Sequence, residues 1–242
     1  MNTRTSKQRF RFQDLIIAEI DDYYLVNKPP YLSSLEDRND PQNLLSLAKE
    51  VDNNLQICHR LDKETSGIVL VAKNLTAYKH FAAQLESRQV KKVYHAILSS
   101  IHRYDNFEAN EPLFTTSKKS RVDFRSGKPS FTLFHTLEIF KKHTLIKCFP
   151  VSGRMHQIRA HLAYHHSPIL SDSSYGGQDA FLSQLKKNYN RSQNRDELPL
   201  IGRTALHAYE LAFKDLNNQE INFTAEYPKD FAVLLKQLRK YN

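Results

Sequence analysis

The clearest candidate for a reacting group is Asp62, in the polar run His59–Gly67 (HRLDKETSG) that leads directly into an apolar strand. A carboxylate on a turn anchored by a buried strand can serve as a nucleophile or a base. Arg60 would help to keep Asp62 ionised, or could reach a phosphate instead. Thr65 can hydrogen-bond the backbone and fix the shape of the turn. Taken alone, the segment favours an ordinary loop ion pair between Arg60 and Asp62, which would contribute little.

A second candidate is Tyr94, at the start of a predicted strand in the run Lys91–Ala96 (KKVYHA). Its ring can stack on a nucleobase, and its hydroxyl can exchange a proton. Considered alone, Tyr94 is better explained as a sheet aromatic whose hydroxyl reaches water. The two lysines before it are typical of an edge strand, or of a contact with a phosphate backbone.

The third cluster is residues 151–162 (VSGRMHQIRAHL), which the spacing predicts to be helical from Met155 onward. Helical spacing puts Arg154 and Gln157 on the surface, away from the apolar stripe. Arg159 borders the stripe, where a buried guanidinium needs a carboxylate partner, and Asp62 would serve. The members of the stripe are Met155, Ile158 and Leu162.

The charge balance points to a polyanionic partner. Lys and Arg total 35 against 26 Asp and Glu, giving a formal net charge of +9 and a pI near 9.4. Phosphate neutralisation drives binding to nucleic acid. Many basic proteins bind no nucleic acid, however, so the charge alone favours neither a nucleic-acid partner nor its absence. No apolar stretch approaches the ~20 residues of a membrane span, and the basic N-terminus lacks the apolar core of a secretion signal. Because the two cysteines are far apart, we expect a cytoplasmic protein without disulfides.

Histidines near the third cluster raise the question of a metal site. Among them, His161 and His165 are four residues apart and share a helical face. The segment lacks the glutamate of an HExxH motif, and no nearby carboxylate offers an evident third ligand. We therefore expect no metal, and assign these side chains to RNA contact or to the surface. The four histidines are His156, His161, His165 and His166.

The apolar pattern predicts strands in hairpins with helices between them. This is typical of an α+β domain with a mixed, mainly antiparallel sheet and flanking helices. The predicted elements are a hairpin at 15–28, a helix at 43–51, a strand at 68–73, a helix from 75, a strand at 93–98, a hairpin at 131–149, a helix at 155–166, paired strands at 206–213 and 221–227, and a C-terminal helix that buries Phe231, Leu234, Leu235 and Leu238.

The domain organisation that we expect is simple. Residues 1–12 are basic with interleaved aromatics and are predicted to form a flexible arm. Residues 13–242 are predicted to form one domain, with a polar surface insertion at about 178–198 that contains one or two helical turns.

The three clusters, in this order, resemble the motifs of the RluA family of pseudouridine synthases. HRLDKETSG is similar to that family's HRLDxxTSG motif, KKVYHAIL to its tyrosine motif, and SGRMHQIRAHL to its GRxHQIRxHL helix. DDYYLVNKPPYLSS resembles its first hairpin and VNKP turn, and TALHAYELAF its closing LHA strand. The resemblance extends from about Leu15 to Phe213, which is nearly a whole catalytic domain.

The resemblance implies a role for each motif residue. Asp62 would be the essential catalytic carboxylate, Tyr94 would stack on the target uracil, and Arg159 would pair with Asp62. Arg60 would take part in extruding the target base, and Leu206 would form part of the apolar wall around it. The further residues that it assigns to substrate binding are His59, Thr65, Arg154, His156 and Gln157.

The reaction that the resemblance implies is the isomerisation of one uridine to pseudouridine in structured RNA, within a central RNA-binding cleft. The bond from uracil to ribose breaks, and the base turns and rejoins through carbon 5. Because no atoms are gained or lost, neither a cofactor nor a metal is expected. Ribosomal RNA is the expected substrate, with transfer RNA as the other option, and a monomer without a protein partner is the expected state.

Departures from the family pattern and alternative functions stay open. Met155 stands where the family has Thr or Ser, and no small RNA-binding domain is expected before residue 15. A non-catalytic RNA-binding paralogue would be indifferent to the loss of Asp62. A metal-dependent hydrolase would use the histidines, and a glycosidase would pair Asp62 with a second acid such as Glu64.

Overall fold

The computed structural model describes residues 9–36, 42–187, 189 and 196–242. The strands are β1 (Ile16–Ile20), β2 (Tyr23–Lys28), β3 (Gln56–Ile57), β4 (Ser66–Ala72), β5 (Lys91–Leu98), β6 (Phe107–Ala109), β7 (Leu113–Thr115), β8 (Ser120–Val122), β9 (Thr132–Ile139), β10 (Thr144–Pro150), β11 (Leu206–Lys214) and β12 (Glu220–Thr224). The helices are α1 (Phe12–Leu15), α2 (Leu44–Val51), α3 (Leu75–Glu86), α4 (Gln157–Tyr164), α5 (Leu182–Leu185), α6 (Lys229–Lys240) and the 3-10 turn η1 (Ser173–Tyr175).

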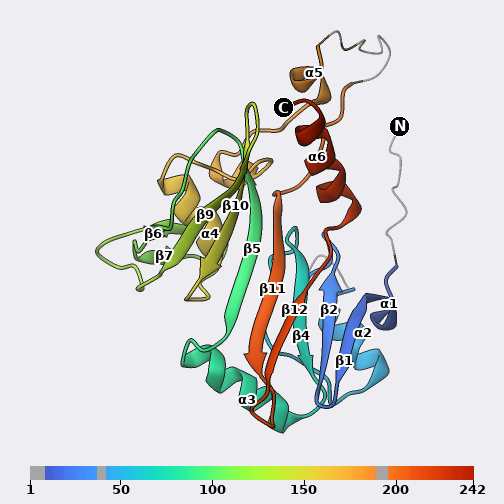
Figure 1. The fold of residues 1–242 in the computed structure, drawn as a ribbon. Helices are drawn as coiled ribbons and strands as arrows, with labels where there is room; N and C mark the ends of the chain where they lie inside the picture. Colours follow the sequence, from blue (N-terminus) through green and yellow to red (C-terminus); the bar gives the residue numbers. More distant parts are fainter. Residues whose placement is uncertain (1–8, 37–41, 188, 190–195) are drawn as a thin grey trace.

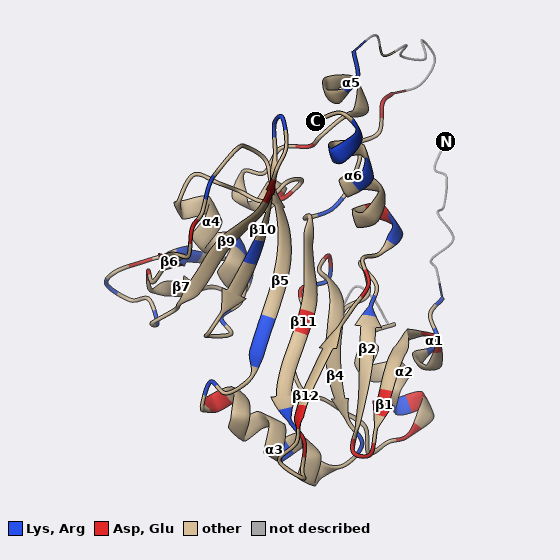
Figure 2. Ribbon diagram, in the orientation of Figure 1, with Lys and Arg blue, Asp and Glu red and all other residues tan. Residues whose placement is uncertain are grey.

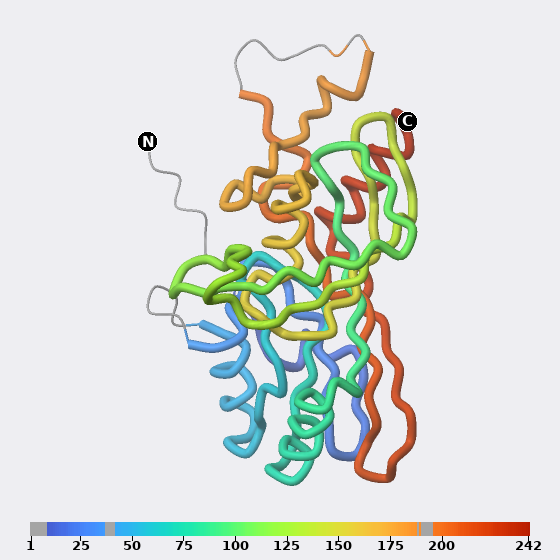
Figure 3. The backbone as a smooth tube through the Cα atoms, turned by 90° about the vertical axis from the view of Figure 1, so that its left-hand side faces the viewer, coloured from blue at the N-terminus to red at the C-terminus, as the bar shows by residue number. Residues whose placement is uncertain are grey.

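One mixed sheet runs through the whole molecule (Figure 1). Within the described residues its strand order is β1–β2–β4–β11–β5–β10–β9–β6, with β3 paired to β4 and β12 to β11. Only the β4–β11 pair is parallel there, while β7 and β8 form a separate hairpin. The predicted mainly antiparallel α+β sheet is therefore confirmed. Seen along its edge, the sheet has α2 and the β7–β8 hairpin on one side and α6 on the other (Figure 3).

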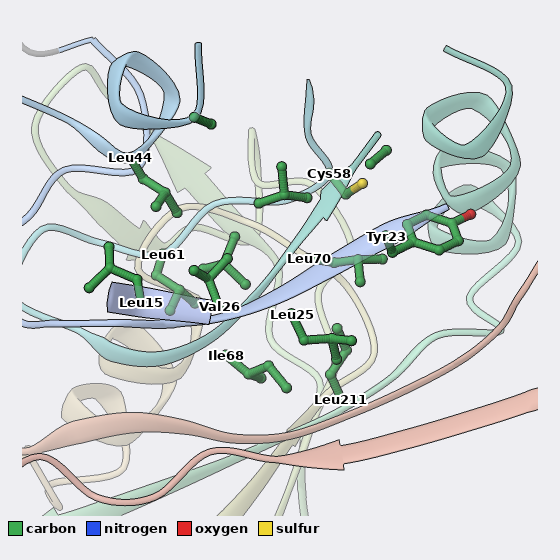
Figure 4. Close-up of a cluster of buried hydrophobic side chains, with 14 of the residues drawn as sticks. Leu15, Tyr23, Leu25, Val26, Leu44, Cys58, Leu61, Ile68, Leu70 and Leu211 are labelled. Atoms are coloured by element: carbon green, nitrogen blue, oxygen red, sulfur yellow. The ribbon is translucent and has the colours of Figure 1, made fainter. Parts of the chain in front are cut away.

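Two apolar cores lie along this sheet. One joins β2 and β4 to α1, α2 and α3, and Figure 4 shows Leu25, Val26 and Leu70 at its centre. The other joins β5, β9 and β10 to α4 and α6. Every residue of β4 is buried, as expected of a strand covered on both faces. None of the helices in the described ranges combines the length and apolar character that a bilayer-spanning segment needs.

Sequence-encoded caps explain where α2 and α3 begin. The side chain of Asn74 accepts a hydrogen bond from the backbone N–H of Ala77 at 2.9 Å and so starts α3, as predicted. Asn43 caps α2 in the same way, and Ser46 completes a capping box. The C-terminal helix α6 buries the four predicted residues, Phe231, Leu234, Leu235 and Leu238.

Three sequence predictions need correction. The helix predicted from Met155 begins at Gln157, because His156 has a left-handed backbone with a φ of 53°. Residues 1–8 lie outside the described residues, but Phe12 is only 1% exposed in α1, so a free arm cannot extend to residue 12. The stretch at 178–198 does contain one helical turn, α5, yet Ala180 is fully buried, so the stretch is not wholly a surface insertion.

The two halves of the sheet meet where β4 crosses β11. Their parallel pairing covers only Ser66 with His207 and Gly67 with Ala208. Gly67 has a φ of +116°, and a Cβ there would lie 2.2 Å from the carbonyl oxygen of Ala208. Only glycine allows the strands to approach this closely.

We predict that Gly67→Ala lowers the free energy of unfolding by about 3 kcal/mol or more, because it adds a backbone clash to an unfavourable φ. Gly176→Ala is the matched control, since Gly176 has a φ of +85° but nothing within 4 Å of an added Cβ. The control should lose only about 1–2 kcal/mol. Urea unfolding measures both, and equal losses would show that the strand contact is unimportant.

Candidate active site

A pocket of about 370 Å³ opens at the junction of the two half-sheets, with walls from the turn before β4, from β5 and β11, and from the segment that leads from β10 into α4. All ten predicted site residues line it. They are His59, Arg60, Asp62, Thr65, Tyr94, Arg154, His156, Gln157, Arg159 and Leu206. The other lining residues are Cys58, Leu61, Leu85, Lys92, Pro150, Ser152, Gly153, Met155 and Ile158.

Asp62 contacts Arg159 as predicted, but it is not the main partner of Arg159. Arg159 Nη1 donates to Asp62 Oδ2 at 3.1 Å. Its Nε and Nη2 donate to the two oxygens of Asp172 at 2.7 and 2.8 Å. The Asp172 side chain is 1% exposed, whereas that of Asp62 is 26% exposed and faces the pocket. One buried guanidinium therefore joins a buried carboxylate to a pocket carboxylate.

Two buried cations fix the backbone of the turn that carries Asp62. The ammonium of Lys28 donates to the carbonyl oxygens of Pro29, Leu32 and Lys63 at 3.0, 2.8 and 3.3 Å. Burial, together with a smaller contribution from the charge of Arg203, lowers the pKa of Lys28 to about 7. Arg203, 1% exposed, donates to the carbonyls of Glu64 and Leu206 and pairs with both oxygens of Asp230. The turn is thus held at the two residues that follow Asp62, Lys63 and Glu64.

His156 completes the surroundings of Asp62. Its Nε2 lies 3.6 Å from Asp62 Oδ2, and its Nδ1 hydrogen-bonds the hydroxyl of Tyr175 at 3.1 Å. Burial lowers the pKa of His156 more than the charge of Asp62 raises it, so the imidazole is neutral at neutral pH. A left-handed backbone at a residue other than glycine costs about 1–2 kcal/mol, and here it aims the ring at the pocket.

Tyr94 lies on β5 and packs against both apolar cores. Burial raises the pKa of its hydroxyl, with a further contribution from the charge of Asp62, so the phenol stays protonated. Leu206, on β11, is 4% exposed and forms an apolar wall of the same pocket.

Gln157 was predicted on the surface, and that prediction is wrong. Its side chain is buried, donating to Phe131 O at 2.8 Å and accepting from the N–H of Arg154 at 3.0 Å. It therefore braces the turn before α4. The error followed from counting helical positions from Met155, although the helix starts two residues later.

The remaining polar side chains are placed as follows. No ion pair joins Arg60 to Asp62 among the described residues, and Arg60 is exposed at the rim of the pocket. Glu64 is held by the hydroxyl and the N–H of Thr204 at 2.8 and 3.2 Å.

In the described ranges no cluster of three or more His, Cys, Asp or Glu side chains is arranged to hold a metal.

His165 has a carboxylate partner, Glu111, that was not predicted from the sequence. Its Nε2 lies 3.1 Å from Glu111 Oε1, and the neighbouring His161 contacts the carbonyl of Glu111 at 3.0 Å. Glu111 comes from the chain between β6 and β7, more than 45 residues before these histidines. No local sequence signal joins them.

Comparison with known proteins shows the family of the chain. Residues 22–164 match the family described as RNA pseudouridylate synthase. The chain belongs to this family. It is 36% identical over 192 residues to the ribosomal large subunit pseudouridine synthase C of Vibrio parahaemolyticus, covering 78% of this chain and 56% of that protein. It is 31% identical over 253 residues to the synthase D of Haemophilus ducreyi, covering 96% of this chain and 73% of that protein.

The solved structure of a human protein has the same fold as this chain. Human RNA Pseudouridylate Synthase Domain Containing 4 superposes with a TM-score of 0.70, covering 94% of this chain and 95% of that one. At 23% identity this likeness concerns the fold. The family and the fold that the motifs predicted are both confirmed.

A pH dependence of stability follows from His59. Its Nε2 accepts from the N–H of Leu70 at 3.1 Å, which requires the unprotonated ring. Burial lowers the pKa of His59 to about 3, with a further contribution from the charge of Lys92. The unfolded chain takes up this proton near pH 6.5, so it binds more protons than the folded chain between the two pKa values. Stability must therefore fall as pH drops below 6.5.

In His59→Gln the side-chain carbonyl can still accept the hydrogen bond from Leu70, but the side chain does not titrate. We predict that between about pH 6.5 and pH 5 the free energy of unfolding falls by about 2 kcal/mol less in this variant than in the wild type. Urea unfolding at both pH values measures this difference. Replacement of the partly exposed His80 by Gln serves as the control and should keep the acid sensitivity of the wild type. The same acid loss in the His59 variant would contradict the prediction.

Proposed function

We propose that the protein is an RNA pseudouridine synthase, with Asp62 as its catalytic carboxylate. The single observation that supports this proposal is a pocket lined by Tyr94 and by the Asp62 carboxylate, which accepts a hydrogen bond from Arg159 at 3.1 Å. A pocket of about 370 Å³ is of the size that small organic groups occupy. It suits one extruded nucleotide.

In the proposed reaction Asp62 acts ionised. It either adds to carbon 1′ of the ribose and displaces uracil, or removes a ribose proton to give a glycal-like intermediate. The detached base turns and carbon 5 bonds to carbon 1′, which breaks the bond from Asp62 to carbon 1′ on the first route; on the second route Asp62 returns its proton to the ribose. The proton on carbon 5 then leaves while nitrogen 1 gains one. Atoms and charge balance without a cofactor, and free uracil is not a product.

Arg159 orients Asp62 in this proposal. Burial lowers the pKa of Arg159, but its hydrogen bonds and the charges of Asp172 and Asp62 raise it more, so the net shift is upward. The charged guanidinium, 3.1 Å from the Asp62 oxygen, holds that carboxylate in one orientation in the pocket. Tyr94 provides the stacking platform and Leu206 the apolar wall, which offset the stacking lost on base extrusion. Arg60 and Arg154, both exposed at the rim, are placed to contact the RNA.

Ribosomal RNA is the proposed substrate, because the relatives compared above are named for the large ribosomal subunit. Residues 13–242 would act as one catalytic domain, a cytoplasmic monomer with RNA as its partner. The net charge of +9 supports a polyanionic substrate. Glu64 is held by Thr204, which disfavours it as the second acid of a glycosidase.

The decisive test uses ribosomal and transfer RNA transcripts labelled with tritium at uracil carbon 5, because the reaction must release that label to water. We predict release by the wild type, and a loss of at least about 10³-fold for Asp62→Asn with RNA affinity retained. Asp105→Asn, at an exposed loop residue, should keep full activity. Binding without release by the wild type would indicate a non-catalytic paralogue, and activity in Asp62→Asn would contradict the assigned carboxylate.

Asp172 is proposed as a positioning residue for Arg159. It makes the bidentate contact that sets the direction of the guanidinium, while Asp62 receives the remaining donor. The turn holding Asp172 is itself fixed, because the N–H groups of Tyr175 and Gly177 donate to its carbonyl. Without the contact to Asp172, the Arg159 guanidinium would move together with the Asp62 side chain and would not fix its orientation.

We predict that Asp172→Asn lowers the single-turnover rate by about 100-fold with little change in RNA affinity, since an error of about 1 Å in orientation has an effect of that order. Glu138→Gln is the matched control, because it alters a carboxylate that pairs with Arg239 through two donors outside the pocket. Thermal unfolding monitored in parallel ensures that folded protein is assayed. A parallel loss of rate and affinity would point to a general loss of structure instead.

A further inference from the structure

Lys92 lies inside the pocket beside the proposed base platform. It is on β5 two residues before Tyr94, so the two side chains project from the same face of the strand, about 6.7 Å apart along it. Its ammonium lies 3.9 Å from the position that a Cβ on Gly153 would take. The side chain therefore spans from the strand to the turn before α4.

The pocket has more cations than its own carboxylate can balance. Four of its lining residues are Arg or Lys, and one is an acid, Asp62. Arg159 is paired with both Asp62 and Asp172. Arg60 and Arg154 are exposed, so water solvates them. Lys92 differs from all three, because it is partly buried and its ammonium makes no hydrogen bond or ion pair with any described residue.

An unpaired ammonium in such a place is unfavourable in the free protein. Burial lowers the pKa of Lys92, which expresses the cost of keeping its charge out of water. An anion entering the pocket would offset that cost, whereas a neutral group would offset little of it. The Lys92 ammonium is therefore suited to bind a negatively charged part of the substrate.

We propose that Lys92 binds a backbone phosphate of the RNA next to the extruded uridine. This inference rests on the proposed function and adds a contact that fixes the reacting nucleotide at a second point. A compact ammonium suits a phosphate oxygen as a point charge, and the rigid strand sets its distance from the ring of Tyr94. The rim arginines would then contact neighbouring phosphates from solvent.

The test is the salt dependence of binding to a short single-stranded oligouridine RNA, measured by fluorescence anisotropy from about 50 to 200 mM salt. Each phosphate contact contributes about 0.7 to the slope of log K against log salt for a single strand. We expect Lys92→Met to reduce that slope by about 0.7, so that its affinity falls about 2.6-fold less than that of the wild type over this range. Lys92→Arg should restore the slope.

Lys91→Met is the matched control. Lys91 is exposed and adjacent in sequence, but its side chain points to the opposite face of β5, so its removal should leave the slope unchanged. A slope for Lys92→Met equal to that of the wild type, or the same reduction in both methionine variants, would overturn the proposal.

A second measurement separates this proposal from the proposed function. In tritium release from the transcript that the wild type modifies, Lys92→Met should raise KM and retain kcat. If kcat falls at unchanged KM, Lys92 acts in the chemistry and the phosphate assignment is wrong. If the wild type releases no label from any transcript, the proposed function fails, and the oligouridine slopes still decide the role of Lys92.

Discussion

The close approach of β4 and β11 at Gly67 is the constraint on which the site depends. The parallel contact spans two residue pairs, yet it joins the half-sheet that carries Asp62 to the half-sheet against which α4 packs. Asp62 and Arg159 are 97 residues apart and reach each other only across this junction. A side chain at Gly67 would separate the strands and, with them, the carboxylate from its guanidinium.

Buried cations turn that junction into a rigid support. Lys28, Arg159 and Arg203 are all at most 8% exposed, and each is surrounded by acceptors from several segments. Removing the carboxylate partner of a buried charge costs about 3–5 kcal/mol, so Arg159 and Arg203 strongly favour the one arrangement in which their carboxylates are in place. Two of the three donate to carbonyls of the turn around Asp62. The turn is thus ordered by charge burial as much as by the strand that follows it.

Sequence patterns predicted what depends on local periodicity or on contiguous motifs. The buried face of α6, the cap at Asn74 and ten of the residues that line the pocket all follow from such signals. Two kinds of feature could not be predicted. A left-handed His156 shifted the start of α4, and with it the burial of Gln157, because backbone strain leaves no mark on apolar spacing. Asp172 was missed because its importance lies in a tertiary contact with Arg159, and an aspartate in a loop is common.

The basic side chains of the pocket have two roles, and the role of each depends on whether it is paired with a carboxylate. Arg159, with two carboxylates, has its position determined before substrate arrives and adds little net positive charge for RNA. Lys92, Arg60 and Arg154 line the same pocket and make no ion pair with a described carboxylate. Preorganisation favours pairing the groups that orient the reacting carboxylate, because they must not move toward the substrate phosphates. Affinity for RNA favours leaving the others unpaired, since only an uncompensated cation releases counterions from a phosphate. Both demands are met within one pocket because Asp172, buried behind Arg159, takes no part in facing the RNA.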